Sequence, residues 1–182
     1  RAGTHATAVA GDIRETEHGT DRVAAARAAV GRIDVLVQNA GGQLQSPAED
    51  ISRNGWRAVH RLSVDSVWNL TREVATRTMI PNRSGLLVFM AFSPRRGIPG
   101  MVHATAARAA VENLASGLAL EWSRFGIRSV AVAPGSILSE GLEQYSAEAR
   151  SEWEQGVPLG RLGRPEDVAD VITFLATDAA RD

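Results

Sequence analysis

The sequence predicts an α/β fold organised around a parallel sheet. Short runs rich in β-branched residues alternate with longer segments of helical periodicity from residue 7 onward, which is typical of consecutive β-α-β units. The chain has 182 residues, of which 44% are hydrophobic and 23% charged, a composition typical of an ordinary globular domain. No apolar run approaches the roughly 18 residues of a membrane span. We therefore expect one domain over residues 1–182, located in the cytoplasm.

Charge and composition exclude several classes of function. The 20 basic and 21 acidic residues give a formal net charge of −1, which argues against nucleic acid or a membrane surface as a partner. The chain has no cysteine, so disulfides, a thiolate nucleophile and cysteine-ligated metals are excluded, and we expect no metal site. All 20 basic residues are arginines. The absence of lysine limits the catalytic groups that are available.

The first half of the chain contains two predicted strands, each followed by a turn. The first strand is predicted at residues 6–10 and the second at 33–37. Between them a helix should begin at residues 20–21, whose side chains can cap it, and end before Gly31, the usual residue after a last helical turn. The second strand leads into the glycine-containing segment 39–42, where the backbone can turn sharply or approach a ligand closely.

The later elements continue the same alternation. They are a long helix at 52–79, a break at 81–85, a buried strand at 86–90, a helix at 103–125, a strand at 127–133 and a helix that begins at Pro165 and passes through Leu175. An apolar stripe lies on one face of the helix at 103–125, formed by Ala107, Val111, Leu114, Leu118 and Trp122. Small residues elsewhere on this helix would allow close packing against a second helix, such as one from another subunit. Gly126 ends the helix.

The loops that follow the predicted strands form the candidate ligand site. Ligands of open parallel sheets bind outside the carboxyl ends of the strands. Asp12 could accept a hydrogen bond from an adenine amino group, and 39–41 offers an amide side chain and bare backbone to a ribose. Taken singly, each feature has a plainer explanation, which we favour. Asp12 could accept its own backbone N–H groups in a turn, and Gly41 and Gly42 could form a tight turn.

Taken together, the order and spacing of these loops resemble the short-chain dehydrogenase/reductase family, a Rossmann-type family of NAD(P)-dependent oxidoreductases. The resemblance covers nearly the whole chain, and its motifs are Gly11-Asp12-Ile13, Asn39-Ala40-Gly41, Arg108-Ala109-Ala110-Val111 and Val132-Ala133-Pro134-Gly135. It implies a doubly wound parallel sheet, here incomplete because the family's strands 1, 2 and 7 are missing. It also implies a cofactor, NADP(H) with NAD(H) as the alternative, bound by Asp12, Ile13, Asn39, Ala40, Gly41, Arg108, Pro134, Gly135 and Ile137.

Within this family, several segments are similar to the peroxisomal-type trans-2-enoyl-CoA reductases, which share the helix at 103–125 with the dienoyl-CoA reductases. The similar segments are 39–43, 46–49, 97–99, 106–109 and 118–122. That branch usually uses NADPH and reduces a C=C bond conjugated to a thioester, in fatty acid metabolism. The resemblance therefore implies an acyl-CoA substrate and a homodimer or homotetramer.

This chain departs from the usual catalytic set of the family. That set contains a Tyr that donates a proton, a Lys four residues later, a Ser and an Asn. The corresponding places hold Ala104, Arg108, about Ala91, and Ser63. Tyr145, the one tyrosine, falls in a predicted substrate loop, so no Tyr–Lys pair can form. Arg108 could hold the nicotinamide ribose through its planar donor fork, but it could not act as an acid at neutral pH.

Reduction of a conjugated enoyl thioester does not depend on that Tyr to the same degree. An enolate develops at the carbonyl, so hydrogen-bond donors can matter more than an acid. The proton could come from water or from another acid, for which Glu112 and His103 are candidates. We favour the plainer explanations, an i,i+4 ion pair of Glu112 with Arg108 and a helix-terminal place for His103. Ser63 could replace part of the role of the Asn, or bond back to a helix carbonyl.

Some features lie outside the motifs. Arg95 and Arg96 could meet the phosphates of CoA, although adjacent surface arginines are more often only solvated. The family's glycine-rich phosphate loop does not occur in the sequence. We therefore expect a fragment, a truncated reading frame or a sequence whose ends were omitted, with the strand at 33–37 exposed at the sheet edge. Two alternatives to an enoyl-CoA reductase stay open. One is a noncatalytic relative that keeps the helix at 103–125 as a dimerisation surface, and the other is an alcohol or ketone oxidoreductase of the same family.

Overall fold

The computed structural model describes residues 5–15, 19–92, 97–142 and 145–181. These residues divide into two compact units, and each is described separately. The first unit comprises residues 5–15, 19–91 and 97–132, and the second comprises residues 92, 133–142 and 145–181. The expectation that residues 1–182 form one domain stays a prediction.

The first unit is built on a parallel sheet of three strands. The strands are β1 (Val35–Gln38), β2 (Gly85–Met90) and β3 (Ile127–Val132), in the order β1-β2-β3. In the register of the sheet, Val88 lies opposite both Val37 and Val130. The predicted α/β fold with a parallel sheet is confirmed. The carboxyl ends of the strands lie at one edge of this sheet, where the candidate loops begin.

The strand predicted at residues 6–10 does not form. These residues are exposed and irregular, and β1 begins at Val35, two residues later than predicted. A β-strand needs a neighbour to satisfy its backbone groups, and β1 pairs only with β2 in the part of the chain that is described. The outer edge of β1 is exposed as expected, since Val35 and Val37 keep 37% and 38% of their surface accessible.

A continuous helical stretch follows β1 and runs from Arg53 to Asn82. Its parts are α2 (Arg53–His60), the π-helical turn η2 (Arg61–Asp65), α3 (Ser66–Val74), the π-helical turn η3 (Ala75–Met79) and α4 (Ile80–Asn82). Ser52 caps the start, because its Oγ accepts a hydrogen bond from the Gly55 N–H at 3.0 Å. The helix continues through Pro81 and ends at Asn82, so the break predicted at 81–85 begins only at Arg83, which adopts φ 50°. The widened turn η3 directly precedes this proline, whose ring would clash with a carbonyl of a regular helix.

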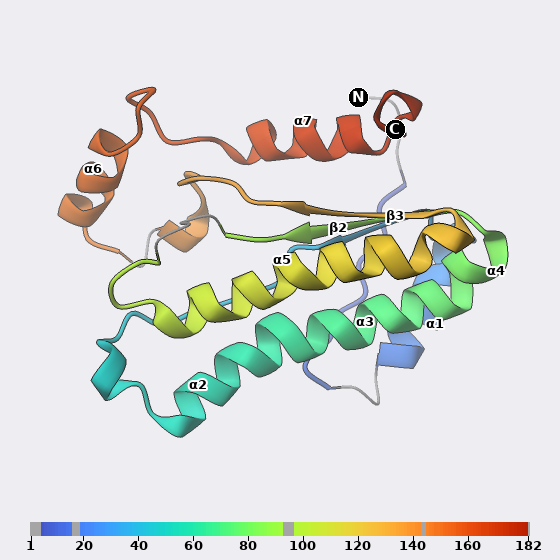
Figure 1. Cartoon of the computed structure of the whole chain (residues 1–182), viewed down its shortest axis with the longest axis horizontal. Coiled ribbons are helices and arrows are strands. Elements are labelled where there is room, and N and C mark those ends of the chain that lie inside the picture. Colours follow the sequence, from blue (N-terminus) through green and yellow to red (C-terminus); the bar gives the residue numbers. More distant parts are fainter. Residues whose placement is uncertain (1–4, 16–18, 93–96, 143–144, 182) are drawn as a thin grey trace. The chain divides into compact units, whose positions relative to one another are not determined.

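Helix α5 (Val102–Trp122) packs against β2 and β3 and lies beside α2 (Figure 1). The predicted apolar stripe faces the core. Val111, Leu118 and Trp122 are buried there with Phe89 and Leu87 of β2, and Leu114 is partly buried against the same cluster. Ala107 is also buried. The short 3-10 turn η4 (Ser123–Phe125) ends at Gly126, which adopts φ 67° and stops the helix as predicted. The sequence pattern thus correctly identified the central helix and its inner face.

Helix α1 (Gly19–Val30) precedes β1 and packs against α3. Its predicted C-terminal glycine is confirmed, since Gly31 has φ 78° and its N–H donates to the Arg27 carbonyl at 2.8 Å. The first unit also contains the short 3-10 turn η1 (Ala48–Asp50).

The second unit contains α6 (Ala147–Gln155), α7 (Pro165–Leu175) and the 3-10 turns η5 (Glu140–Leu142) and η6 (Asp178–Ala180). Helix α7 starts at Pro165 and includes Leu175, as predicted. None of the described residues in this unit is buried. Within it, Gly163 connects two segments, donating to the Ser136 carbonyl at 2.9 Å and accepting from the Leu138 N–H at 2.7 Å. No helix in the described ranges is both long and apolar enough to cross a membrane.

Candidate active site

Arg108 lies at the carboxyl end of the sheet. Helix α5 carries this half-buried side chain, whose Nη1 donates to the carbonyl of Met90, the last residue of β2, at 2.6 Å. Burial lowers the pKa of Arg108 from its usual value. The guanidinium has five N–H donors, and the hydrogen bond to Met90 uses one of them among the described residues, so it retains donors for a ligand.

Gly41 allows Arg108 to take this position. A Cβ atom added to Gly41 would lie 1.9 Å from Arg108 Nη2 and 2.7 Å from Cζ. Any side chain at residue 41 would therefore collide with the guanidinium. The Asn39-Ala40-Gly41 motif and Arg108, which come from distant parts of the sequence, meet at one place. The sequence showed both motifs, but it could not show that the glycine makes room for the arginine.

No carboxylate forms an ion pair with Arg108 among the described residues. The expected pair with Glu112 is wrong. Glu112 is exposed on α5, and its carboxylate makes no described contact with Arg108. The reason is that the Arg108 side chain is drawn to the end of β2 and to Gly41, away from the helix surface where i,i+4 pairs form. The positive charge of Arg108 is thus available to a ligand.

Gln38 fixes the end of β1 directly before this motif. Its side chain is buried, and its Nε2 donates to the Val67 carbonyl at 3.1 Å and to Thr71 Oγ1 at 2.9 Å, both on α3. These bonds anchor the end of the strand, which is followed by exposed Asn39 and Ala40. Sequence reasoning missed Gln38. Its signal was a polar residue that closes an apolar strand immediately before the Asn-Ala-Gly motif.

Asp12 is engaged by its own neighbour. Its carboxylate accepts from Arg14 Nε at 2.9 Å on both oxygens, from Arg14 Nη2 at 2.5 Å, and from the Arg14 backbone N–H at 2.9 Å. These hydrogen bonds to Arg14 lower the pKa of Asp12. This turn is the plainer explanation that the sequence offered. The adenine contact stays a prediction, and it would have to share the carboxylate with Arg14. Ile13 lines a pocket of about 500 Å³ together with Val23 and Leu36.

Ser63 lies in the middle of the π-helical turn η2, which packs against α5. Its residue surface is 2% exposed. Ser63 does not make the expected bond back to a helix carbonyl, and its hydroxyl makes no described hydrogen bond. The neighbouring Ser66 does make such a bond, from its Oγ to the Leu62 carbonyl. A π turn often marks a functional site in a helix. Because the Ser63 hydroxyl makes no described hydrogen bond, it keeps its hydrogen-bonding capacity for a ligand. Its catalytic role stays a prediction.

The first turn of α5 holds a buried histidine beside the place of the missing tyrosine. His103 is 0% exposed, and neither ring nitrogen has a partner. Because no surface of His103 is accessible, it cannot touch a substrate in this conformation. Ala104, at the tyrosine place, and Ala91, at the serine place, are both buried and carry no hydroxyl. The described residues at these three places offer no exposed proton donor.

The remaining predicted residues lie elsewhere. Pro134, Gly135 and Ile137 belong to the second unit, where Ile137 forms an isolated parallel bridge with Gly163. Their contact with a cofactor stays a prediction. Arg95 and Arg96 lie outside the described residues. Tyr145, in the second unit, stacks edge-on with Trp153 at a ring-centroid distance of 4.8 Å.

The whole chain matches a known protein family. The family model described as enoyl-(acyl carrier protein) reductase matches residues 1–182. The "Probable 2,4-dienoyl-CoA reductase" of Bacillus subtilis (strain 168) is 37% identical over 174 residues, which cover 93% of this chain and 68% of that protein. The gluconate 5-dehydrogenase of Gluconobacter oxydans (strain 621H) is 32% identical over 181 residues, covering 98% of this chain and 70% of that protein.

A solved structure shows the same similarity in three dimensions. It is a gluconate 5-dehydrogenase from Burkholderia cenocepacia J2315 in complex with NADP and tartrate, which is 28% identical and matches with a TM-score of 0.87. The match covers 94% of this chain and 68% of that one. These similar proteins are thus named for reactions on two kinds of substrate, a dienoyl-CoA and gluconate.

Proposed function

The chain belongs to the short-chain dehydrogenase/reductase family, and on that premise we propose that it is an NADP(H)-dependent oxidoreductase that reduces the C=C bond of an enoyl-CoA thioester. The observation that carries this proposal is the pair of residues at the places of the family's tyrosine and lysine, which are Ala104 and Arg108 here. Arg108 stands at the carboxyl end of the sheet with free donors, while Ala104 removes the usual proton donor. A site of that kind suits a reaction that needs charge stabilisation more than acid catalysis.

The residues around Arg108 fit the nicotinamide-ribose end of NADP(H). Asn39 is exposed and its amide makes no described hydrogen bond, and the backbone of Gly41 is also exposed. Together with Arg108 they would hold the ribose, and Asp12 and Ile13 are proposed for the adenine end. When bound, the cofactor supplies the hydride. A glycine-rich cradle for its phosphates does not occur among the residues of this sequence.

Arg108 contributes positive charge and positioned N–H groups. A negative charge that develops on a thioester carbonyl would be stabilised by donors of this kind. The planar guanidinium stays protonated at neutral pH, so it can donate hydrogen bonds but not the proton itself. Because His103 is inaccessible, we infer that the proton at the α-carbon comes from water.

A second candidate is an alcohol or ketone oxidoreductase, which the similarity to gluconate 5-dehydrogenases favours. The lack of a hydroxyl at Ala91 and Ala104 argues against it, because the carbonyl oxygen would have no acid beside it. The noncatalytic alternative predicts that the chain neither binds the cofactor nor turns over a substrate. The cytoplasmic location stays an expectation.

Consumption of NADPH with two substrates separates these candidates. Crotonyl-CoA tests reduction of a C=C bond, and 5-ketogluconate tests reduction of a ketone. Turnover of crotonyl-CoA alone, lost in Arg108→Met and kept in Arg181→Gln, is the expected result. Turnover of the ketone alone would move the assignment to the second candidate.

Cofactor binding is measured separately by thermal unfolding. NADPH at a hundredfold excess over its dissociation constant should stabilise the folded chain by about 2.7 kcal/mol. If NADPH causes no stabilisation and neither substrate is turned over, the result counts against the proposed reductase activity for this chain and favours the noncatalytic alternative.

A further inference from the structure

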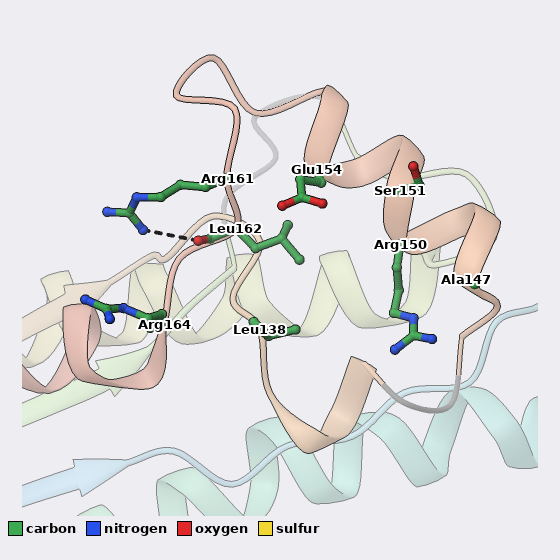
Figure 2. A pocket seen from close by; sticks show the side chains of 8 residues that line it. All are labelled: Leu138, Ala147, Arg150, Ser151, Glu154, Arg161, Leu162 and Arg164. Atoms are coloured by element: carbon green, nitrogen blue, oxygen red, sulfur yellow. Dashed lines mark hydrogen bonds between the residues drawn. The ribbon is translucent and has the colours of Figure 1, made fainter.

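The second unit contains a pocket whose walls are rich in arginine (Figure 2). Its volume is about 710 Å³, within the range of small-molecule sites. Helix α6 provides one wall through side chains spaced three and four residues apart, which therefore lie on one face. The lining residues are Leu138, Ala147, Arg150, Ser151, Glu154, Arg161, Leu162 and Arg164.

Two of the three arginines already have a carboxylate partner. Arg161 Nη1 donates to Asp167 Oδ2 at 3.2 Å, and Arg164 Nη2 lies 4.0 Å from Asp167 Oδ1. These interactions, led by the hydrogen bond from the Arg164 backbone N–H, lower the pKa of Asp167. In Figure 2 the guanidinium groups of Arg161 and Arg164 point away from α6. Asp167 thus offsets one of these two positive charges within the unit.

Arg150 is different. Its Nε is buried without a hydrogen-bond partner, and no ion pair reaches its guanidinium among the described residues. Glu148 lies near enough for the charge of Arg150 to help lower the pKa of Glu148, although hydrogen bonds near the start of α6 are the larger cause. A buried N–H of a cation that lacks an acceptor costs free energy, which a bound anion would recover.

The rest of the lining limits the kind of anion. Leu138, Leu162 and Ala147 make part of the wall apolar, and Ser151 adds a hydroxyl one residue after Arg150. Glu154, also on α6, carries a negative charge that would repel an anion. Three guanidinium groups against this one lining carboxylate leave the wall positive. The pocket therefore suits a ligand that combines an oxyanion with an apolar portion.

We propose that this pocket binds the oxyanion of an amphipathic small molecule, a phosphate or a carboxylate, and that Arg150 is its principal donor. The inference rests on the proposed function in one respect only, namely that a phosphate of a coenzyme A thioester is taken as the first source of the oxyanion. A carboxylate such as that of a sugar acid has the same chemistry and is the second source. The site itself is defined by residues of the second unit alone.

Isothermal titration of the intact chain without NADPH tests the site. The probes are coenzyme A, inorganic phosphate and gluconate. We expect either the phosphate-bearing probes or gluconate to bind. The Arg150→Gln substitution should raise the dissociation constant of the bound probe at least tenfold. Arg181→Gln, which removes the same charge from an exposed pair with Asp178 in the same unit, should leave binding unchanged. Coenzyme A with competing phosphate would identify a phosphate site, and gluconate alone would identify a carboxylate site.

Two further variants keep the test decisive if Arg150→Gln unfolds the unit. Glu154→Gln removes the repelling charge, so it should tighten binding several-fold, while Arg150→Lys keeps the charge and should bind weakly because it loses the planar fork. Binding that is equal in wild type and all Arg150 and Glu154 variants overturns the proposal, as does failure of all three probes to bind. Because no turnover is measured, loss of the proposed reductase activity would not produce either result.

Discussion

The two units of this chain are stabilised in different ways. In the first unit, Phe89 and Leu87 of β2 are 0% exposed and pack beneath α5. In the second unit no described residue is buried, and Phe174 of α7 keeps 55% of its surface accessible. Local polar contacts take the place of a core there, such as the Ser146 cap of α6, whose Oγ accepts from the Ala149 N–H at 3.2 Å.

Because of this difference, the geometry of the two candidate sites depends on different interactions. A closely packed core fixes the position of Arg108 and Gly41 within the first unit, so the geometry of that site depends on steric fit. The arginine pocket of the second unit depends on charges and hydrogen bonds at the surface. Salt and pH should therefore affect the second unit more than the first.

Removal of an aromatic side chain tests this comparison with the largest expected effect. Phe89→Ala should lower the free energy of unfolding by about 3 to 5 kcal/mol, because it leaves a cavity in the core. Phe174→Ala should change it by no more than about 0.5 kcal/mol, as for other exposed positions. Urea unfolding followed by circular dichroism measures both. Equal losses would show that α7 is buried in solution.

Two glycines, one directly after η4 and one in the middle of α5, should respond with opposite signs. Gly126 has φ 67°, and a Cβ there would lie 2.5 Å from the Arg83 carbonyl oxygen, so Gly126→Ala should cost about 1 to 2 kcal/mol. Gly117 faces open space within the helix, and Gly117→Ala should stabilise by about 0.5 to 1 kcal/mol. Thermal unfolding compares the two, and a loss at both positions would contradict the geometry of α5.

Gly41→Ala should disturb the candidate active site more than the fold. The new Cβ would displace the Arg108 guanidinium, and we expect the dissociation constant for NADPH to rise about tenfold, which is about 1.4 kcal/mol. Fluorescence titration measures this constant, with Gly117→Ala as the matched control. An unchanged constant in Gly41→Ala would show that the position of Arg108 does not matter for the cofactor.

The smallest effect is expected at the start of α7. The hydrogen bond from the Arg164 N–H at 2.8 Å, followed by that from Arg161, lowers the pKa of Asp167 below its usual value of 3.8. The ionised form is therefore favoured in the folded state. Its contribution to stability is fully present above the unfolded-state pKa and is lost as pH falls through the lower folded-state pKa.

Acid titration of helicity measures this contribution. Wild type should lose α7 helicity as the pH falls below about 4, and Asp167→Asn should weaken that pH dependence. Asp170→Asn, which changes the same charge on the same helix away from its cap, is the control. A pH profile of Asp167→Asn that coincides with wild type would exclude this cap as a source of stability.

The sequence by itself determined most of the regular elements of the first unit, the start of α7 and the family motifs. Apolar spacing predicted the inner face of α5, alternation predicted a parallel sheet, and Gly31 and Gly126 marked two helix ends, because periodicity and backbone freedom are local properties. The residues of the candidate site were also visible as motifs at the ends of strands. Their predicted roles in cofactor binding still await the experiments above.

Tertiary structure decided everything that depends on a distant neighbour. Residues 6–10 have a strand-like sequence but no adjacent strand among the described residues, so they stay irregular. Arg108 could pair with Glu112 by spacing alone, yet the Met90 carbonyl and the space at Gly41 draw it elsewhere. Burial of Gln38 against α3 and of His103 without a partner depends on packing. Such contacts join residues far apart in the chain, and no local pattern encodes them.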